Sequence, residues 1–164
     1  VGLDKFVAMA TEGGATIDNR GAKGLMTAFY EACPEIPLWW KDEIEFCQEN
    51  LYVETWFGRR RYLPGILHPN RGLREAAERE AVNTTAQGTG ADVIKLVLRR
   101  VWEQLQGTNS RIILSAHDDV LVEAREDEAV QVGEVLAGMT RGLLPIELPV
   151  TVKIGHNWGE MEDA

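Results

Sequence analysis

The chain has 164 residues, of which 45% are hydrophobic and 26% charged, a composition typical of one soluble domain with a core of its own. No apolar run comes near the roughly 18 residues that a membrane helix needs, and the first residues carry no signal-peptide pattern. We therefore expect a cytoplasmic protein with no membrane partner. The net charge of −9 at pH 7 by itself argues against nucleic-acid binding, which depends on lysine and arginine.

The first half of the chain is predicted to be mainly helical. Apolar residues recur at helical spacing, and Gly13, Gly14 and Pro34 interrupt the pattern. The predicted helices cover residues 3–11, 22–33 and 38–51. A β-prone stretch at 52–57, a basic turn and a loop at 64–71 that is rich in proline and glycine follow.

The second half combines helices with strands. Helical patterns return at 73–81, 89–105 and 126–141. A hairpin is predicted at 111–124, and residues 149–154 predict a last strand. Helices followed by a small antiparallel sheet, built from the hairpin and the last strand and packed on helices, indicate an α+β fold.

Two cysteines, Cys33 and Cys47, lie fourteen residues apart. Neither belongs to a CxxC or CxxH pattern. The spacing therefore predicts two reduced thiols rather than a disulfide or a zinc site.

The basic residues of this acidic chain are concentrated in one stretch. Six arginines fall within 21 residues, namely Arg59, Arg60, Arg61, Arg71, Arg74 and Arg79. The first three form a basic turn, and guanidinium groups suit bidentate recognition of phosphate. A local basic surface is thus feasible, and the alternative is scattered, solvated charge.

The segment His117-Asp118-Asp119 is the most informative of the chain, because it separates two apolar, β-prone runs. Adjacent carboxylates at the tip of a hairpin repel each other, and a divalent metal is the usual compensation. An acidic turn with a partly buried histidine is the alternative. An HD-type phosphohydrolase would need further histidine ligands, but His68 lies in a proline-rich loop and His156 follows the last strand.

A second pattern lies about thirty residues earlier. Arg79, Asn83 and Gln87 follow each other at four-residue intervals, which keeps them on one face of a helix. Their donors and acceptors suit base edges and sugars in a DNA groove. At Gly88 the backbone could approach a ligand closely. The alternative is a polar face in contact with solvent.

Taken together, these motifs resemble those of the family A DNA polymerases in order and in approximate spacing. The resemblance extends from about residue 2 to the end and covers the C-terminal part of the polymerase domain. The matching segments are 55–64, 74–79, 83, 87–89, 91–92, 117–119 and 155–158.

The resemblance implies roles for the hairpin residues. Asp118 matches the palm aspartate that binds catalytic metal, and His117 matches the residue beside the primer terminus. Asp119 stands where the family usually has glutamate, so its part in catalysis and metal binding rests on a shorter side chain.

The resemblance also implies DNA contacts. Arg79, Asn83 and Gln87 match the helix residues that read the minor groove of primer–template DNA. The turn at Arg59, Arg60 and Arg61 matches the one that grips the DNA backbone. Thr85 replaces a frequent proline, a change expected to affect helix shape more than chemistry.

The activity implied is that of a DNA-dependent DNA polymerase in replication or repair, in a nucleoid or at a viral replication site in the cytoplasm. Its partners are primer–template DNA and a dNTP, and its cofactor is a pair of Mg²⁺ ions. Residues 1–72 would form part of the fingers, and 73–164 part of a palm with its palm-type sheet.

The family's other metal aspartate, its phosphate-binding lysine and its nucleotide-binding tyrosine are expected upstream of this chain. The Mg²⁺ site would then be only partly contained here, and the chain alone would be inactive. We expect its complement, the N-terminal part of the polymerase, to be a separate chain or segment that covers an exposed apolar face. The alternative function is a non-catalytic module, derived from a palm, that binds duplex DNA or a partner protein.

Overall fold

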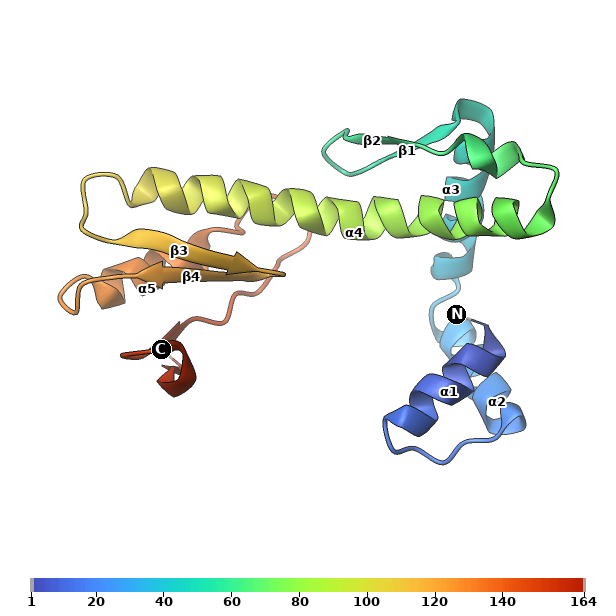
Figure 1. The fold of residues 1–164 in the computed structure, drawn as a ribbon, viewed down its shortest axis with the longest axis horizontal. Coiled ribbons are helices and arrows are strands. Elements are labelled where there is room, and N and C mark those ends of the chain that lie inside the picture. The colour runs from blue at the N-terminus through green and yellow to red at the C-terminus, as the bar shows by residue number, and fades with distance from the viewer. Residues whose placement is uncertain (1, 164) are drawn as a thin grey trace. The chain divides into compact units, whose positions relative to one another are not determined.

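Figure 1 shows the computed structural model, which describes residues 2–163. Helices and short antiparallel strand pairs make up the chain, so the predicted α+β class is confirmed. Two compact units are present, one made of residues 2–53 and 60–83 and the other of residues 54–59 and 84–163. The division at residue 72 into fingers and palm stays a prediction.

The first unit begins with three helices, α1 (Leu3–Glu12), α2 (Asn19–Ala32) and α3 (Glu35–Asn50). The side chain of Asp18 caps α2 by accepting a hydrogen bond from the Gly21 amide at 2.7 Å. α3 begins three residues earlier than predicted, because Pro37 lies in its first turn, where the missing amide costs nothing. It ends at Asn50 and is followed by Leu51, whose left-handed φ of 62° stops the helix.

The core of the first unit includes residues of α3, the strand pair, the short 3-10 helix and the start of α4. β1 (Tyr52–Glu54) pairs with β2 (Arg60–Tyr62), and η1 (Pro64–Leu67) follows. The buried side chains are Cys47, Val53, Leu63, Ile66, Ala77 and Ala81. Burial, and secondarily the charge of Glu43, raises the pKa of the Cys47 thiol, so this cysteine is a core side chain rather than a reactive one.

α4 (Arg71–Gln104) is one helix of 34 residues. The sequence predicts two helices here, 73–81 and 89–105, with an interruption at residues 82–88. That interruption is wrong, because the helix continues through these residues. Residues 82–88 include asparagine, threonine and glycine, which favour helix only weakly. Packing outweighs this weak propensity, since Ala81 is fully buried and Thr84 is nearly so.

In the second unit, the C-terminal half of α4, the hairpin of β3 (Arg111–Ala116) and β4 (Asp119–Glu123), and α5 (Ala129–Gly138) surround a second core (Figure 1). The predicted hairpin is confirmed. The buried side chains are Val97, Val101, Leu105 and Val132. Arg100 donates to the carbonyls of Met139 and Arg141 at 2.9 Å each, which satisfies acceptors at the end of α5.

The last strand differs from the prediction. β5 is limited to Lys153–Ile154 and pairs with β6 (Glu162–Asp163), not with the β3–β4 hairpin. Pro145 and Pro149 lack the amide that a sheet requires, which accounts for the irregular chain before β5. No helix within residues 2–163 is both long and apolar enough to cross a bilayer.

Candidate metal and nucleic-acid site

His117 and Asp118 form the two-residue turn of the β3–β4 hairpin, and Ala116 pairs with Asp119 across it. The φ of His117 is +55° and that of Asp118 is not positive, which is the φ pattern of a type II′ turn. Glycine is usual at the first position, and a residue with a Cβ there costs about 1–2 kcal/mol. Such strain persists only where the surrounding structure holds it, which marks the turn as a candidate functional site.

The hairpin extends back along α4 (Figure 1). At about 3.3 Å per residue, residues 111–117 extend over about 23 Å. The same length along α4 corresponds to about 15 helical residues, which we count back from Leu105, just after the end of the helix. The turn is thus expected beside α4 near Gly90, one helical turn from Gln87. Gln87 lies on the face of α4 that also carries Val97 and Val101, against which the hairpin packs. We therefore expect the turn and Gln87 to lie on one side of the helix.

The three side chains at the turn, His117, Asp118 and Asp119, are exposed. Within residues 2–163, neither carboxylate forms an ion pair or accepts a hydrogen bond from a side chain. Two free carboxylates are oxygen donors of the kind that Mg²⁺ prefers. No group of three or more metal-ligating side chains gathers in the described part of the chain, so an HD-type site finds no support there.

A buried contact supports the base of the hairpin. Ser110, 7% exposed, donates its hydroxyl to Glu128 at the start of α5 over 2.6 Å, and Asn109 donates to the same carboxylate at 3.3 Å. The hydrogen bond from Ser110, with help from Asn109, holds the pKa of Glu128 below its usual value against the opposing effect of burial. These bonds join β3 to α5 and orient the hairpin.

Arg79, Asn83 and Gln87 are exposed on α4. Among the described residues, none of the three side chains forms a hydrogen bond or an ion pair. Their polar groups are therefore available to a ligand outside the chain. The predicted helical spacing is confirmed, whereas the predicted groove contact stays a prediction.

Arg59 is bound inside the second unit. Its Nε donates to Asp92 Oδ1 at 2.8 Å, and its Nη2 donates to the Gly88 carbonyl at 3.1 Å. Burial alone would raise the pKa of Asp92, but the hydroxyl of Thr55 and the guanidinium of Arg59, with a smaller effect of Lys95, bring it below its usual value. Asp92 thus stays ionised, although its Oδ2 is buried without a partner in the described chain.

Four further arginines of the basic stretch also have partners in the first unit. The guanidinium of Arg60 lies 4.5 Å from the ring centre of Tyr52. The ion pairs are Arg61–Glu80 at 3.0 Å, Arg71–Glu75 at 2.6 Å and Arg74–Glu78 at 3.9 Å. Ion pairs exposed in this way are weak because water and salt screen them, so a phosphate could replace the acidic partner. The side chain of Arg79, alone of the six, forms no hydrogen bond, ion pair or ring contact within residues 2–163, although its charge helps to lower the pKa of Glu75.

The backbone at Gly88 is closely approached, as predicted, but by the β1–β2 turn of this chain rather than by a ligand. A Cβ at this position would lie 2.8 Å from Thr55 Cγ2 and 3.2 Å from Arg59 Nη2. The glycine therefore serves the contact between the β1–β2 turn and α4 rather than the approach of a ligand.

Sequence reasoning did not find Asp92, Ser110 or Glu128 as supports of the site. The only sequence feature that could have indicated Asp92 is its place in segment 91–92, which matches the motifs of family A polymerases. Its partner Arg59 is 33 residues away, beyond the reach of any local pattern.

Comparison with known proteins identifies the family. A family model described as DNA polymerase family A matches residues 7–160. The chain belongs to DNA polymerase family A. This confirms the resemblance seen in the sequence.

Two relatives of this family A chain illustrate its extent. It is 34% identical over 143 residues to "DNA polymerase I, thermostable" of Thermus thermophilus, covering 87% of the chain and 17% of the relative. It is 34% identical over 148 residues to DNA polymerase I of Pseudomonas aeruginosa, covering 88% of the chain and 16% of the relative. The chain thus spans about one sixth of the length of these curated relatives.

A solved structure is similar to the family A chain in fold as well as in sequence. It is the POL domain of Pol1 from M. smegmatis in complex with DNA primer-template and dNTP. The TM-score is 0.76 at 32% sequence identity, covering 85% of this chain and 25% of that one.

Proposed function

We propose that the chain is part of a DNA-dependent DNA polymerase, in which a primer 3′-hydroxyl attacks the α-phosphate of a dNTP and pyrophosphate leaves. Membership of family A supports this, as does the DNA primer-template and dNTP in the M. smegmatis complex. The observation in this chain that carries the proposal is the β3–β4 turn, with two exposed carboxylates that form no internal ion pair.

Asp118 and Asp119 are the residues that would hold Mg²⁺. Magnesium bound there would lower the pKa of the primer hydroxyl and offset charge on the phosphate oxygens. Asp118, at the turn, would contribute one carboxylate to the catalytic metal site. Asp119, the first residue of β4, would contribute the neighbouring carboxylate. The exposed imidazole of His117 would contact the primer end.

The DNA would contact polar groups that the fold leaves available. Arg79, Asn83 and Gln87 would donate to the acceptors in the minor groove, which are present on every base pair. Arg60 and Arg61, both exposed, would exchange their partners within the chain for backbone phosphates. The first 72 residues would then belong to the fingers and the remainder to the palm.

We further propose that this chain does not catalyse alone. A two-metal site needs a further carboxylate, and the dNTP needs a binding helix, both of which the family carries in an earlier segment. That segment would also cover exposed apolar side chains such as Leu25, Phe29 and Leu38, which are 57%, 51% and 61% exposed. The complete enzyme would act in DNA replication or repair in the cytoplasm.

Primer extension with Mg²⁺ tests the proposal, using the chain alone and mixed with the N-terminal part of a family A polymerase domain. Extension is expected only in the mixture. Asp118→Asn should abolish it while duplex binding persists, and Asp42→Asn, an equal change at an exposed position of α3, should leave it unaltered. Unchanged extension by Asp118→Asn would overturn the catalytic assignment. Duplex binding with no extension in any mixture would favour the non-catalytic binding module.

A further inference from the structure

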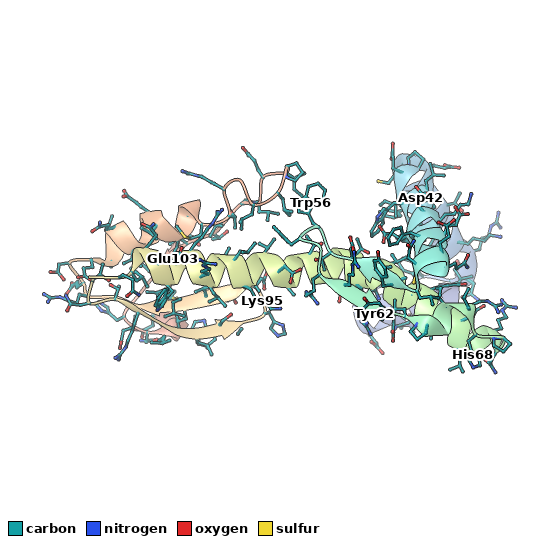
Figure 2. The ribbon with its side chains drawn as sticks, turned by 90° about the horizontal axis from the view of Figure 1, so that it is seen from above. Asp42, Trp56, Tyr62, His68, Lys95 and Glu103 are labelled. Atoms are coloured by element: carbon teal, nitrogen blue, oxygen red, sulfur yellow. The ribbon has the colours of Figure 1, made fainter. Side chains whose placement is uncertain are left out.

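The turn segment, Glu54–Arg59, is attached to the middle of α4 by several hydrogen bonds. The Trp56 amide donates to Thr89 Oγ1 at 2.9 Å, and Arg59 donates to Asp92 and to the Gly88 carbonyl. Figure 2 labels Trp56 at this turn and Lys95 on α4. The side chain of Lys95 lies 3.9 Å from the Asp92 carboxylate and adds to the pairing.

The turn segment is itself well ordered by internal bonds. Thr55, 4% exposed, accepts from the Gly58 amide at 2.9 Å and donates its own amide to the Arg59 carbonyl at 3.0 Å. The Thr55 hydroxyl also accepts from the Arg59 amide at 3.1 Å. Arg59 is therefore fixed at its backbone and at its guanidinium.

The part of α4 under this segment is intrinsically weak as a helix. Residues 84–90 read Thr-Thr-Ala-Gln-Gly-Thr-Gly, in which two glycines and three threonines lower helix propensity. The same seven residues include Gln87, the proposed groove contact. Bonds to the turn segment would hold this stretch helical and so orient the Gln87 side chain.

The two sides of α4 are distinct at this level. Gly88, Thr89 and Asp92, which face the turn segment, fall within about 100° of the helix circumference. Gln87 points about 150° away from the middle of that arc, on the side of the β3–β4 hairpin. A duplex that meets Gln87 would thus lie across the helix from Arg59.

We infer that Asp92 and Arg59 are positioning residues for DNA recognition: they act through α4 on Gln87 rather than by binding phosphate. The inference rests on the proposed function, because it takes Gln87 as a groove contact. Asp92 accepts a hydrogen bond from the Arg59 guanidinium, and the guanidinium in turn donates to the Gly88 carbonyl. Because Gln87 immediately precedes Gly88, these bonds fix the backbone that carries the Gln87 side chain.

Salt titrations of duplex binding by the chain separate the two roles of Arg59. Asp92→Asn, Arg59→Ala and Gln87→Ala should each weaken binding about 3- to 10-fold, which corresponds to the loss of one hydrogen bond. Neither Asp92→Asn nor Arg59→Ala should change the slope of log K against log salt, whereas Arg61→Ala, which removes a proposed phosphate contact, should make it shallower by about 0.9. A shallower slope for Arg59→Ala, or tighter binding by Asp92→Asn, would overturn the inference.

A base analogue gives a readout that general destabilisation would not move. A duplex that carries 3-deazaadenine only at the base pair that meets Gln87 lacks one N3 acceptor of the minor groove, so wild type and the control Asp42→Asn should bind it more weakly than normal DNA. Asp92→Asn and Gln87→Ala should not distinguish the two duplexes. If Gln87→Ala distinguishes them like wild type, the groove contact fails and the inference with it. If Asp92→Asn alone behaves like wild type, the groove contact stands and the inference is overturned.

Discussion

Gly88→Ala tests the contact between the turn segment and α4 directly, and Gly90→Ala is its matched control. Both glycines are interior to the helix without positive φ, so each alanine should gain about 1 kcal/mol of helix propensity. At Gly90 a Cβ meets nothing within 4 Å, whereas at Gly88 it would lie 2.8 Å from Thr55 Cγ2. The two variants therefore differ only in the collision.

The size of the difference follows from the neighbours. Arg59 Nη2, at 3.2 Å from the added Cβ, is the end of a flexible side chain and can move. Thr55 is buried and β-branched, so its methyl group cannot rotate away freely. Overpacking of this kind costs about 1–3 kcal/mol, which leaves Gly88→Ala about 0–2 kcal/mol less stable than wild type. Gly90→Ala should be about 1 kcal/mol more stable.

Urea denaturation followed by circular dichroism measures the free energies, and hydrogen exchange of the Trp56 amide reports on the turn segment itself. Thr55→Ser removes the colliding methyl and keeps the hydroxyl, so the double variant Thr55→Ser/Gly88→Ala should regain most of the loss. Equal stability of Gly88→Ala and Gly90→Ala, with unchanged exchange at Trp56, would refute the reasoning.

Two further predictions concern Asp92 and His117. The folded pKa of Asp92 lies below the unfolded value of about 3.9, so its contribution is complete well above that pH and is lost as pH falls through the folded pKa. At neutral pH, Asp92→Asn should lower the free energy of unfolding by about 1–3 kcal/mol. In urea titrations from pH 7 to 3, the stability of this variant should fall less than that of wild type. Parallel pH profiles of the two proteins would contradict this. His117→Gly should be about 1 kcal/mol more stable than His117→Ala, because only glycine accepts a φ of +55° without strain. Primer extension by both should fall if the imidazole contacts the primer, and equal stabilities would mean that the turn relaxes.

The elements that could be predicted are those specified by neighbouring residues. The β3–β4 hairpin is one, because two apolar runs on either side of His117-Asp118-Asp119 define both strands and the turn. The residues that flank Gly88 were a harder case. Their weak helix propensity predicts an interruption. The helix is continuous because this stretch contacts Thr55 and Arg59, about thirty residues earlier, and because neighbouring residues of α4 are buried.

The strand β6 shows the same limit at the other end of the chain. Glu162 and Asp163 have low strand propensity, so no strand was predicted there. Their pairing with Ile154 and Lys153, with 3.7 Å between Lys153 Nζ and Asp163 Oδ1, supplies what the local sequence lacks. A cross-strand partner decides the outcome, and the local sequence does not name it.

The arginine-rich stretch explains why site residues are harder to predict than folds. Its composition indicates phosphate binding for all six arginines alike, yet the fold divides them. Arg59 is held by a buried carboxylate, and Arg61 by an exposed one that a phosphate could displace. Arg79 is left with no ion pair among the described residues. A guanidinium acts on a ligand only when no stronger partner inside the fold already holds it, and the partner here, Asp92, stands 33 residues away in the sequence. That distinction requires the structure: it removes Arg59 from the expected DNA contacts and leaves Arg60, Arg61 and Arg79 among them.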